Sequence, residues 1–121
     1  MKLRSNGDSQ HGLTASLTAA VNGMVTLTLA VTNTTSQSQT LHFPTSQQAD
    51  FLATLPAGGA PVWHWAHGMS FAQMLGSVTL APGDNLVHSV TWHAPRGSWL
   101  VTGRLTSTSH DAEATTIVAV P

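Results

Sequence analysis

The side chains best suited to chemistry in this sequence are its seven histidines, and two of them, His64 and His67, stand together in the stretch VWHWAHGMSF. A zinc or copper ion would need three or four converging ligands, and two side chains of one strand converge only at i, i+2 spacing. No His-x-His pair occurs, and a regular strand would send His64 and His67 to opposite faces. We therefore expect surface or hydrogen-bonded histidines and no metal, with a site built through tertiary pairing as the less favoured alternative.

The acidic residues offer little to a hydrolase that works with paired carboxylates. Four of the five acids fall in apparent turns or in the tail, and Asp50 alone stands at the start of an expected strand, where a turn or cap role accounts for it. There is no cysteine, no Gly-x-Ser-x-Gly motif and no phosphate-binding glycine loop. The sequence thus predicts a protein that is not an enzyme and that needs no cofactor. The acids considered are Asp8, Asp50, Asp84, Asp111 and Glu113.

Charged residues make up only 7% of the chain, against roughly 25% in an average soluble domain. The net charge is -1, and the strong bases are Lys2, Arg4, Arg96 and Arg104. Nucleic acid and anionic membranes need a clustered cationic surface, so we expect neither as a partner. The polar residues that follow the first four residues do not form the apolar core of a signal peptide. We expect a cytoplasmic protein, or a secreted or cell-envelope protein if a signal peptide has been removed.

Hydrophobic residues alternate with polar residues along most of the chain, which is typical of half-buried strands. The clearest example is 24–32, and 13–19 precedes it across an Asn-Gly pair that suits a hairpin turn. Residues 70–75 are predicted to form one helical turn that acts as a crossover. The predicted strands cover residues 13–19, 24–32, 40–43, 50–55, 62–67, 78–80, 86–92, 98–106 and 114–120.

About eight short strands without an amphipathic helix predict an all-β, immunoglobulin-like antiparallel β-sandwich. A chain of 121 residues has room for one domain and one core. We assign the sandwich to residues 11–121 and expect residues 1–10 to be a flexible N-terminal segment. The expected core includes Trp63 and Trp65, which would share one face of a strand, together with Leu27, Leu29 and Phe43.

Several segments, taken in order, resemble the pattern of one protein family. They are Leu29–Thr35, Leu41–Phe51, Val62–Trp65 with Gly68, Phe71 and Gln73, Leu80–Gly83, and Trp92 with Gly97 and Val101–Gly103. The most specific parts are the Ser-Gly-Gln-like segment and the Trp-x-Trp that is followed by Gly and Phe. Over about residues 25–106 the chain resembles the BsuPI family of intracellular proteinase inhibitors. The resemblance implies an immunoglobulin-like sandwich that binds and inhibits a serine protease of subtilisin type.

An inhibitory loop must be exposed and held extended by its scaffold, so that little entropy is lost on binding. The segment Ala94–Ser98 is stiffened by a proline and presents Arg96, which suits a trypsin-like pocket. The segment His67–Ser70 presents Met69, and Met69 or Leu75 suits a subtilisin-like pocket. The candidate partner-binding residues are Met69, Phe71, Trp92, Pro95, Arg96 and Trp99.

These observations favour a monomer or weak dimer that inhibits a serine protease by occluding its active site with a loop. One alternative is a non-catalytic interaction module that recruits another protein through a sheet edge or an aromatic patch. The other is a carbohydrate-binding module that uses the tryptophans as stacking platforms.

Overall fold

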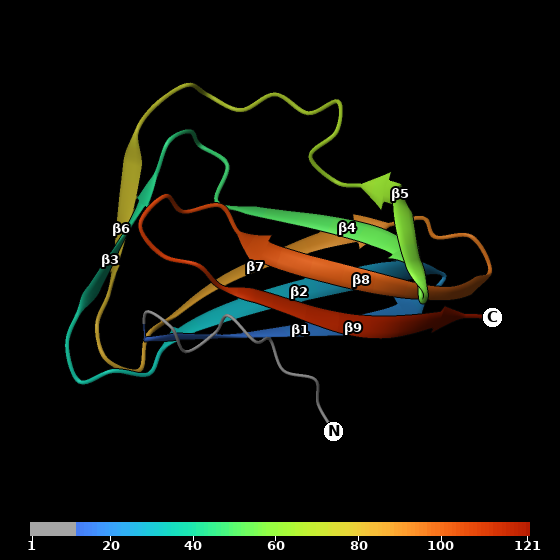
Figure 1. The fold of residues 1–121 in the computed structure, drawn as a ribbon, viewed down its shortest axis with the longest axis horizontal. Helices are drawn as coiled ribbons and strands as arrows, with labels where there is room; N and C mark the ends of the chain where they lie inside the picture. The colour runs from blue at the N-terminus through green and yellow to red at the C-terminus, as the bar shows by residue number, and fades with distance from the viewer. Residues whose placement is uncertain (1–11) are drawn as a thin grey trace.

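The computed structural model describes residues 12–121, and these form nine strands and no helix (Figure 1). The predicted flexible segment 1–10 lies outside the described residues. Within residues 12–121 there is no helix long and apolar enough to cross a membrane. The strands are β1 (Leu13–Asn22), β2 (Met24–Asn33), β3 (Gln39–Phe43), β4 (Ala49–Leu55), β5 (Gly58–His64), β6 (Gly76–Leu80), β7 (Asn85–Trp92), β8 (Gly97–Leu105) and β9 (Glu113–Val120).

The strands form two main layers that share one core. One sheet has the order β1-β2-β7 and the other the order β5-β4-β8-β9, and every pairing is antiparallel. Strands β3 and β6 pair with each other and lie at one end of the long axis (Figure 1). The arrangement confirms the predicted immunoglobulin-like antiparallel sandwich.

The alternation in the sequence decides which side chains enter the core. In β2 the odd-numbered positions from Val25 to Val31 are buried, and the residues between them are not. The hairpin that joins β1 to β2 closes at Gly23, whose φ of 76° is a left-handed conformation that favours glycine. Of the expected core residues, Leu27, Leu29 and Phe43 are buried, whereas Trp63 and Trp65 lie partly buried at the edge of the core.

Phe51 is the largest of the fully buried side chains. It pairs across β4 and β8 with Gly103, and a Cβ atom at position 103 would lie 3.2 Å from the Phe51 ring and 3.2 Å from Leu17 of β1. Because Gly103 has no side chain, the ring of Phe51 has room to pack toward Leu17 of the opposite sheet.

A buried asparagine joins the end of β2 to the end of β6. The side-chain amide of Asn33 donates to the carbonyls of Gln37 (2.8 Å) and Leu80 (2.9 Å), and its oxygen accepts from the backbone N–H and the hydroxyl of Thr35. A fully buried amide is tolerated because all of these groups have partners. The network holds the end of β6 against the end of β2.

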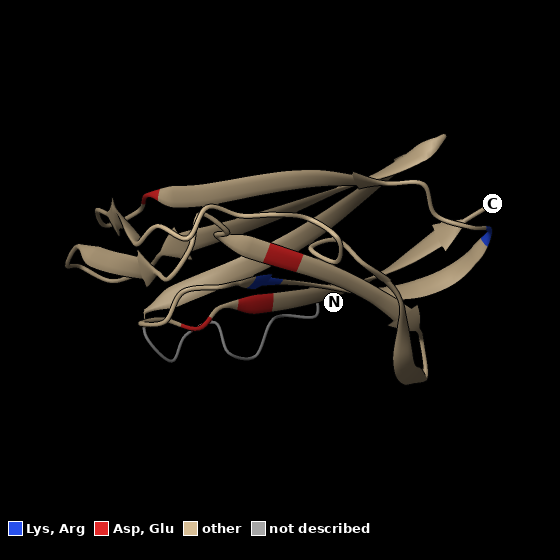
Figure 2. Cartoon of the chain, turned by 90° about the horizontal axis from the view of Figure 1, so that it is seen from above, with Lys and Arg blue, Asp and Glu red and all other residues tan. Residues whose placement is uncertain are grey.

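Charged residues are few on the described ribbon and form no continuous stripe; Arg104 of β8 and Glu113 of β9 lie opposite each other on paired strands (Figure 2). Between residues 51 and 83 the sequence contains no Lys, Arg, Asp or Glu. This uncharged stretch covers most of β4, all of β5 and β6, and the long loop between β5 and β6.

Candidate functional site

Strand β5, which carries Trp63 and His64, ends earlier than the sequence pattern predicted. It begins at Gly58, after the turn Pro56–Ala57, and ends at His64. The chain then turns: the N–H of His67 donates to the carbonyl of His64 (3.1 Å), and that of Met69 to the carbonyl of Ala66 (3.0 Å). The prediction of a strand through His67 was therefore wrong, because local turn bonds replace the ladder.

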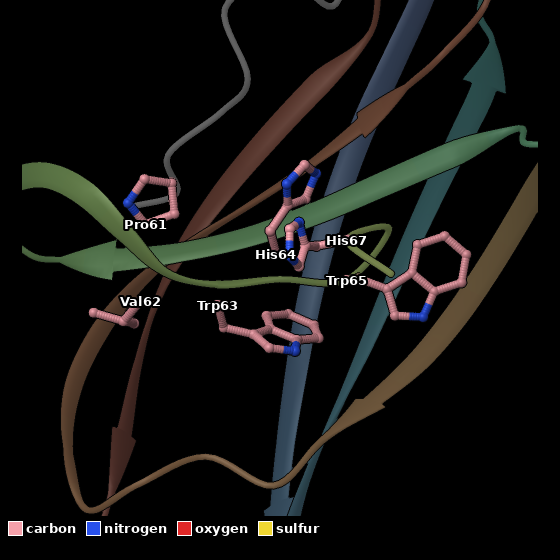
Figure 3. A pocket seen from close by; sticks show the side chains of 6 residues that line it. All are labelled: Pro61, Val62, Trp63, His64, Trp65 and His67. Atoms are coloured by element: carbon pink, nitrogen blue, oxygen red, sulfur yellow. The ribbon is translucent and has the colours of Figure 1, made fainter. Parts of the chain in front are cut away.

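This turn changes where the two histidines point. His64 and His67 line the same open hollow of about 600 Å³, together with Pro61, Val62, Trp63 and Trp65 (Figure 3). The expectation of opposite faces assumed a regular strand and was wrong for that reason. Within residues 12–121, no three His, Asp or Glu side chains gather closely enough to hold a metal ion.

Asp50 holds this turn against β4. Its Oδ2 lies 2.6 Å from Nε2 of His64, and its Oδ1 accepts from the N–H groups of Phe51 (2.8 Å) and Ala66 (3.3 Å). The Asp50 side chain is buried, and that of His64 is 42% exposed. The carbonyl of Phe51 still accepts from the N–H of Trp65 (2.9 Å). The carboxyl group thus supplies the acceptor that the departing strand no longer offers to Phe51.

A catalytic triad would need a nucleophile on the histidine as well as the acid. Among the described residues, no serine or threonine hydroxyl is hydrogen-bonded to His64, whose ring bonds to Asp50 alone. The pair positions a turn and has no arrangement for nucleophilic attack.

Three tryptophans pack in a row at the edge of the core. The rings of Trp63 and Trp92 stack at 4.8 Å, and Trp99 meets Trp92 at 6.1 Å with its edge. Trp92 is only 6% exposed, because the two other rings cover it. Its prediction as a partner-binding residue was wrong: Trp92 belongs to the core.

Trp65 lies between two phenylalanines. Its ring meets Phe51 at 6.0 Å, edge to face, and Phe71 at 5.8 Å. Phe71 is partly buried and packs on Trp65, so it holds the middle of the β5–β6 loop against the sandwich. Met69 beside it is 47% exposed. The faces that a sugar would stack on are thus partly taken by aromatic neighbours.

The loop between β7 and β8 presents two of the other predicted binding residues, Pro95 and Arg96, which are exposed. Trp99, partly buried, donates from Nε1 to the carbonyl of Pro95 (2.9 Å) and braces the loop from below. This loop lies at the end of the long axis opposite to β3 and β6 (Figure 1). The structure therefore separates Arg96 from β6 and does not bring the candidates together in one site.

The predicted helical turn at 70–75 is wrong: these residues form an irregular loop, and another part of the chain holds it. The backbone of Ala72 is bonded on both sides to Ser46: its carbonyl accepts from the Ser46 N–H (2.9 Å), and its N–H donates to Ser46 Oγ (2.8 Å). Past this clamp, Met74 is 64% and Leu75 is 84% exposed. Sequence reasoning missed the role of Ser46 in holding this loop. The available signal that the loop is exposed was the pair Met74 and Leu75, two large apolar residues in a segment without strand periodicity.

One histidine gives an expected pH dependence. His88 on β7 is partly buried and hydrogen-bonds through Nε2 to Oε1 of Gln48 (2.9 Å), and burial lowers its pKa from the usual 6.5. The unfolded chain then binds the proton more readily, so the stability from His88 is complete above pH 6.5 and is lost as the pH falls toward the lower folded pKa. We expect the free energy of unfolding to fall as the pH drops below 6.5, and to fall less in His88→Gln. Urea titrations at several pH values test this, and equal slopes for both proteins would contradict it.

The fold and these loops define an immunoglobulin-like domain whose β5–β6 and β7–β8 loops are held to the sandwich by hydrogen bonds. The chain belongs to the BsuPI family, described as "Intracellular proteinase inhibitor", whose family model matches residues 13–119. No curated protein matches the chain.

Several solved structures contain a distantly similar domain. DesR, a β-glucosidase from Streptomyces venezuelae, is 17% identical with a TM-score of 0.46, over 90% of this chain and 15% of that chain. A β-glucuronidase from Bacteroides uniformis is 14% identical with a TM-score of 0.45, over 90% of this chain and 13% of that chain. A β-glucosidase from Bifidobacterium adolescentis is 16% identical with a TM-score of 0.44, over 90% and 17%. The chain spans a small part of each of these enzymes, and we draw nothing about its activity from them.

Proposed function

We propose that this protein inhibits a serine protease of subtilisin type by occluding its active site with a surface loop. The observation that carries the proposal, beside membership of a proteinase-inhibitor family, is the largely exposed loop between β5 and β6. Its chain is clamped at Ala72 by Ser46, and it presents large apolar side chains.

The mechanism is steric and needs no chemistry by this protein and no cofactor. A loop that is already restrained by hydrogen bonds to its scaffold loses less conformational entropy when it enters the cleft. The two packed sheets that carry the loop resist the change in loop conformation that cleavage by the protease would require. The family description places such proteins inside cells, and we include a cytoplasmic location in the proposal.

The test is a pair of activity titrations, with subtilisin and with trypsin, against increasing amounts of the purified protein at neutral pH. We expect subtilisin activity to fall in proportion to the added protein until roughly one equivalent is present, with the inhibitor intact by mass. Full subtilisin activity in the presence of a large excess of protein would refute the proposal.

A further inference from the structure

The three residues before β6 form a short bridge between two fixed points. On one side Ala72 is clamped through both backbone groups by Ser46. On the other side Gly76 is the first residue of β6 and pairs with Phe43 at the end of β3. We call residues 73–75 the bridge.

Both fixed points lie on the same piece of chain. Phe43 and Ser46 are separated only by Pro44 and Thr45, and the proline ring restricts the backbone between them. Phe43 is itself buried, so the piece is rooted in the core. Both ends of the bridge are therefore anchored to one short segment that contains a proline, which limits the conformations that residues 73–75 can adopt.

The bridge carries the most exposed large apolar side chain among the described residues. Leu75 is 84% and Met74 is 64% exposed, and neither packs on the core. Two large apolar side chains in succession that stay in water give up the free energy that burial would provide. A rigid loop that keeps such side chains in water is typical of an interaction site whose partner buries them.

We propose that Ala72–Leu75 enters the protease cleft as an extended strand and that Leu75 fills the primary specificity pocket, with Leu75–Gly76 facing the catalytic serine. This inference rests on the proposed function and names the residues that perform it. The partner is a serine protease whose specificity pocket takes large apolar side chains. The sequence from residue 51 to residue 83 contains no Lys or Arg, so it fits such a pocket better than an acidic one.

Leu75→Asp is the decisive variant, because it puts a charge into an apolar pocket while changing a residue that the fold does not bury. We expect its inhibition constant for subtilisin to rise by at least about 100-fold. The matched control is Ile117→Asp on β9, an exposed apolar residue (55%) outside the loop, which should inhibit like the wild type. Urea titration of both variants shows that they fold.

A second variant tests the same pocket by gain of activity. Leu75→Arg places a long basic side chain where Leu75 stood, so the bridge should then fit the acidic pocket of trypsin. We expect measurable trypsin inhibition from Leu75→Arg and none from the wild type.

The outcomes separate the inference from the proposed function. If the wild type inhibits subtilisin and Leu75→Asp inhibits equally well, another loop binds and the inference fails while the proposed function stands. If the wild type inhibits neither enzyme, both fail as statements about inhibition. Mass analysis after long incubation with subtilisin adds an independent readout: a first cut at Leu75–Gly76, by hydrolysis of that amide, supports the placement of the bridge in the cleft, and a first cut elsewhere overturns it.

Discussion

Phe51→Ala is expected to lower the free energy of unfolding by about 3–5 kcal/mol. The ring is 1% exposed, reaches over Gly103 toward Leu17 of the opposite sheet, and contacts Trp65 at 6.0 Å. Alanine would leave a cavity that two hydrogen-bonded sheets cannot collapse into freely. The free energy of unfolding of a native protein is roughly 5–15 kcal/mol in total. A large part of the stability of this domain therefore depends on one side chain. Urea titration followed by tryptophan fluorescence measures the loss.

Two further variants keep this test interpretable. Phe51→Leu, which fills most of the space, should cost less than about 2 kcal/mol and remains measurable if the alanine variant does not fold. Gly103→Val approaches the same space from the other side, because its side chain would collide with the Phe51 ring and Leu17. We expect a loss of about 1–3 kcal/mol from this overpacking. A change below 1 kcal/mol for Phe51→Ala would show that the ring is not the centre of the core.

Alternation of apolar and polar residues was sufficient to predict the sandwich, because each half-buried strand presents one face to the core. It worked best in β2, where the buried odd-numbered positions are those of the pattern. It failed at the end of β5, since nothing in a period of two shows that the chain will turn at Trp65. The turn depends on Asp50, fourteen residues from His64 in sequence, and such a distant acceptor leaves no local signal.

The candidate site was harder to predict than the fold for the same reason. Met69 and Arg96 were correctly expected at the surface, but Trp92 was not, because its burial depends on Trp63 and Trp99. The clamp of Ala72 joins segments that are 26 residues apart. A short segment such as 70–75 fits one helical turn as well as an irregular loop, and the hydrogen bonds to Ser46 favour the loop.

Asp50→Ala is expected to lower the free energy of unfolding by about 2–4 kcal/mol and to release the turn that carries Trp65 and His67. The variant removes three hydrogen bonds at once, to His64 and to the N–H groups of Phe51 and Ala66. The N–H of Phe51 is buried and would have no acceptor, which costs more than the loss of an exposed bond. Unfolding by urea measures the energy, and amide hydrogen exchange at residues 51 and 66 measures the release.

Two matched variants show which of these bonds matters. Asp50→Asn keeps an oxygen that accepts from both N–H groups, so it should lose less than half as much stability as Asp50→Ala. His64→Ala removes only the bond to the partly exposed ring, and we expect a loss below about 1 kcal/mol. If His64→Ala instead cost as much as Asp50→Ala, the ring would be the main contact of Asp50 and its role as the acceptor at the end of the β4–β5 ladder would be wrong. We therefore expect the loss in free energy of unfolding to be largest for Asp50→Ala, smaller for Asp50→Asn and smallest for His64→Ala. This order tests whether the buried carboxyl group of Asp50 replaces the acceptor that the strand no longer supplies.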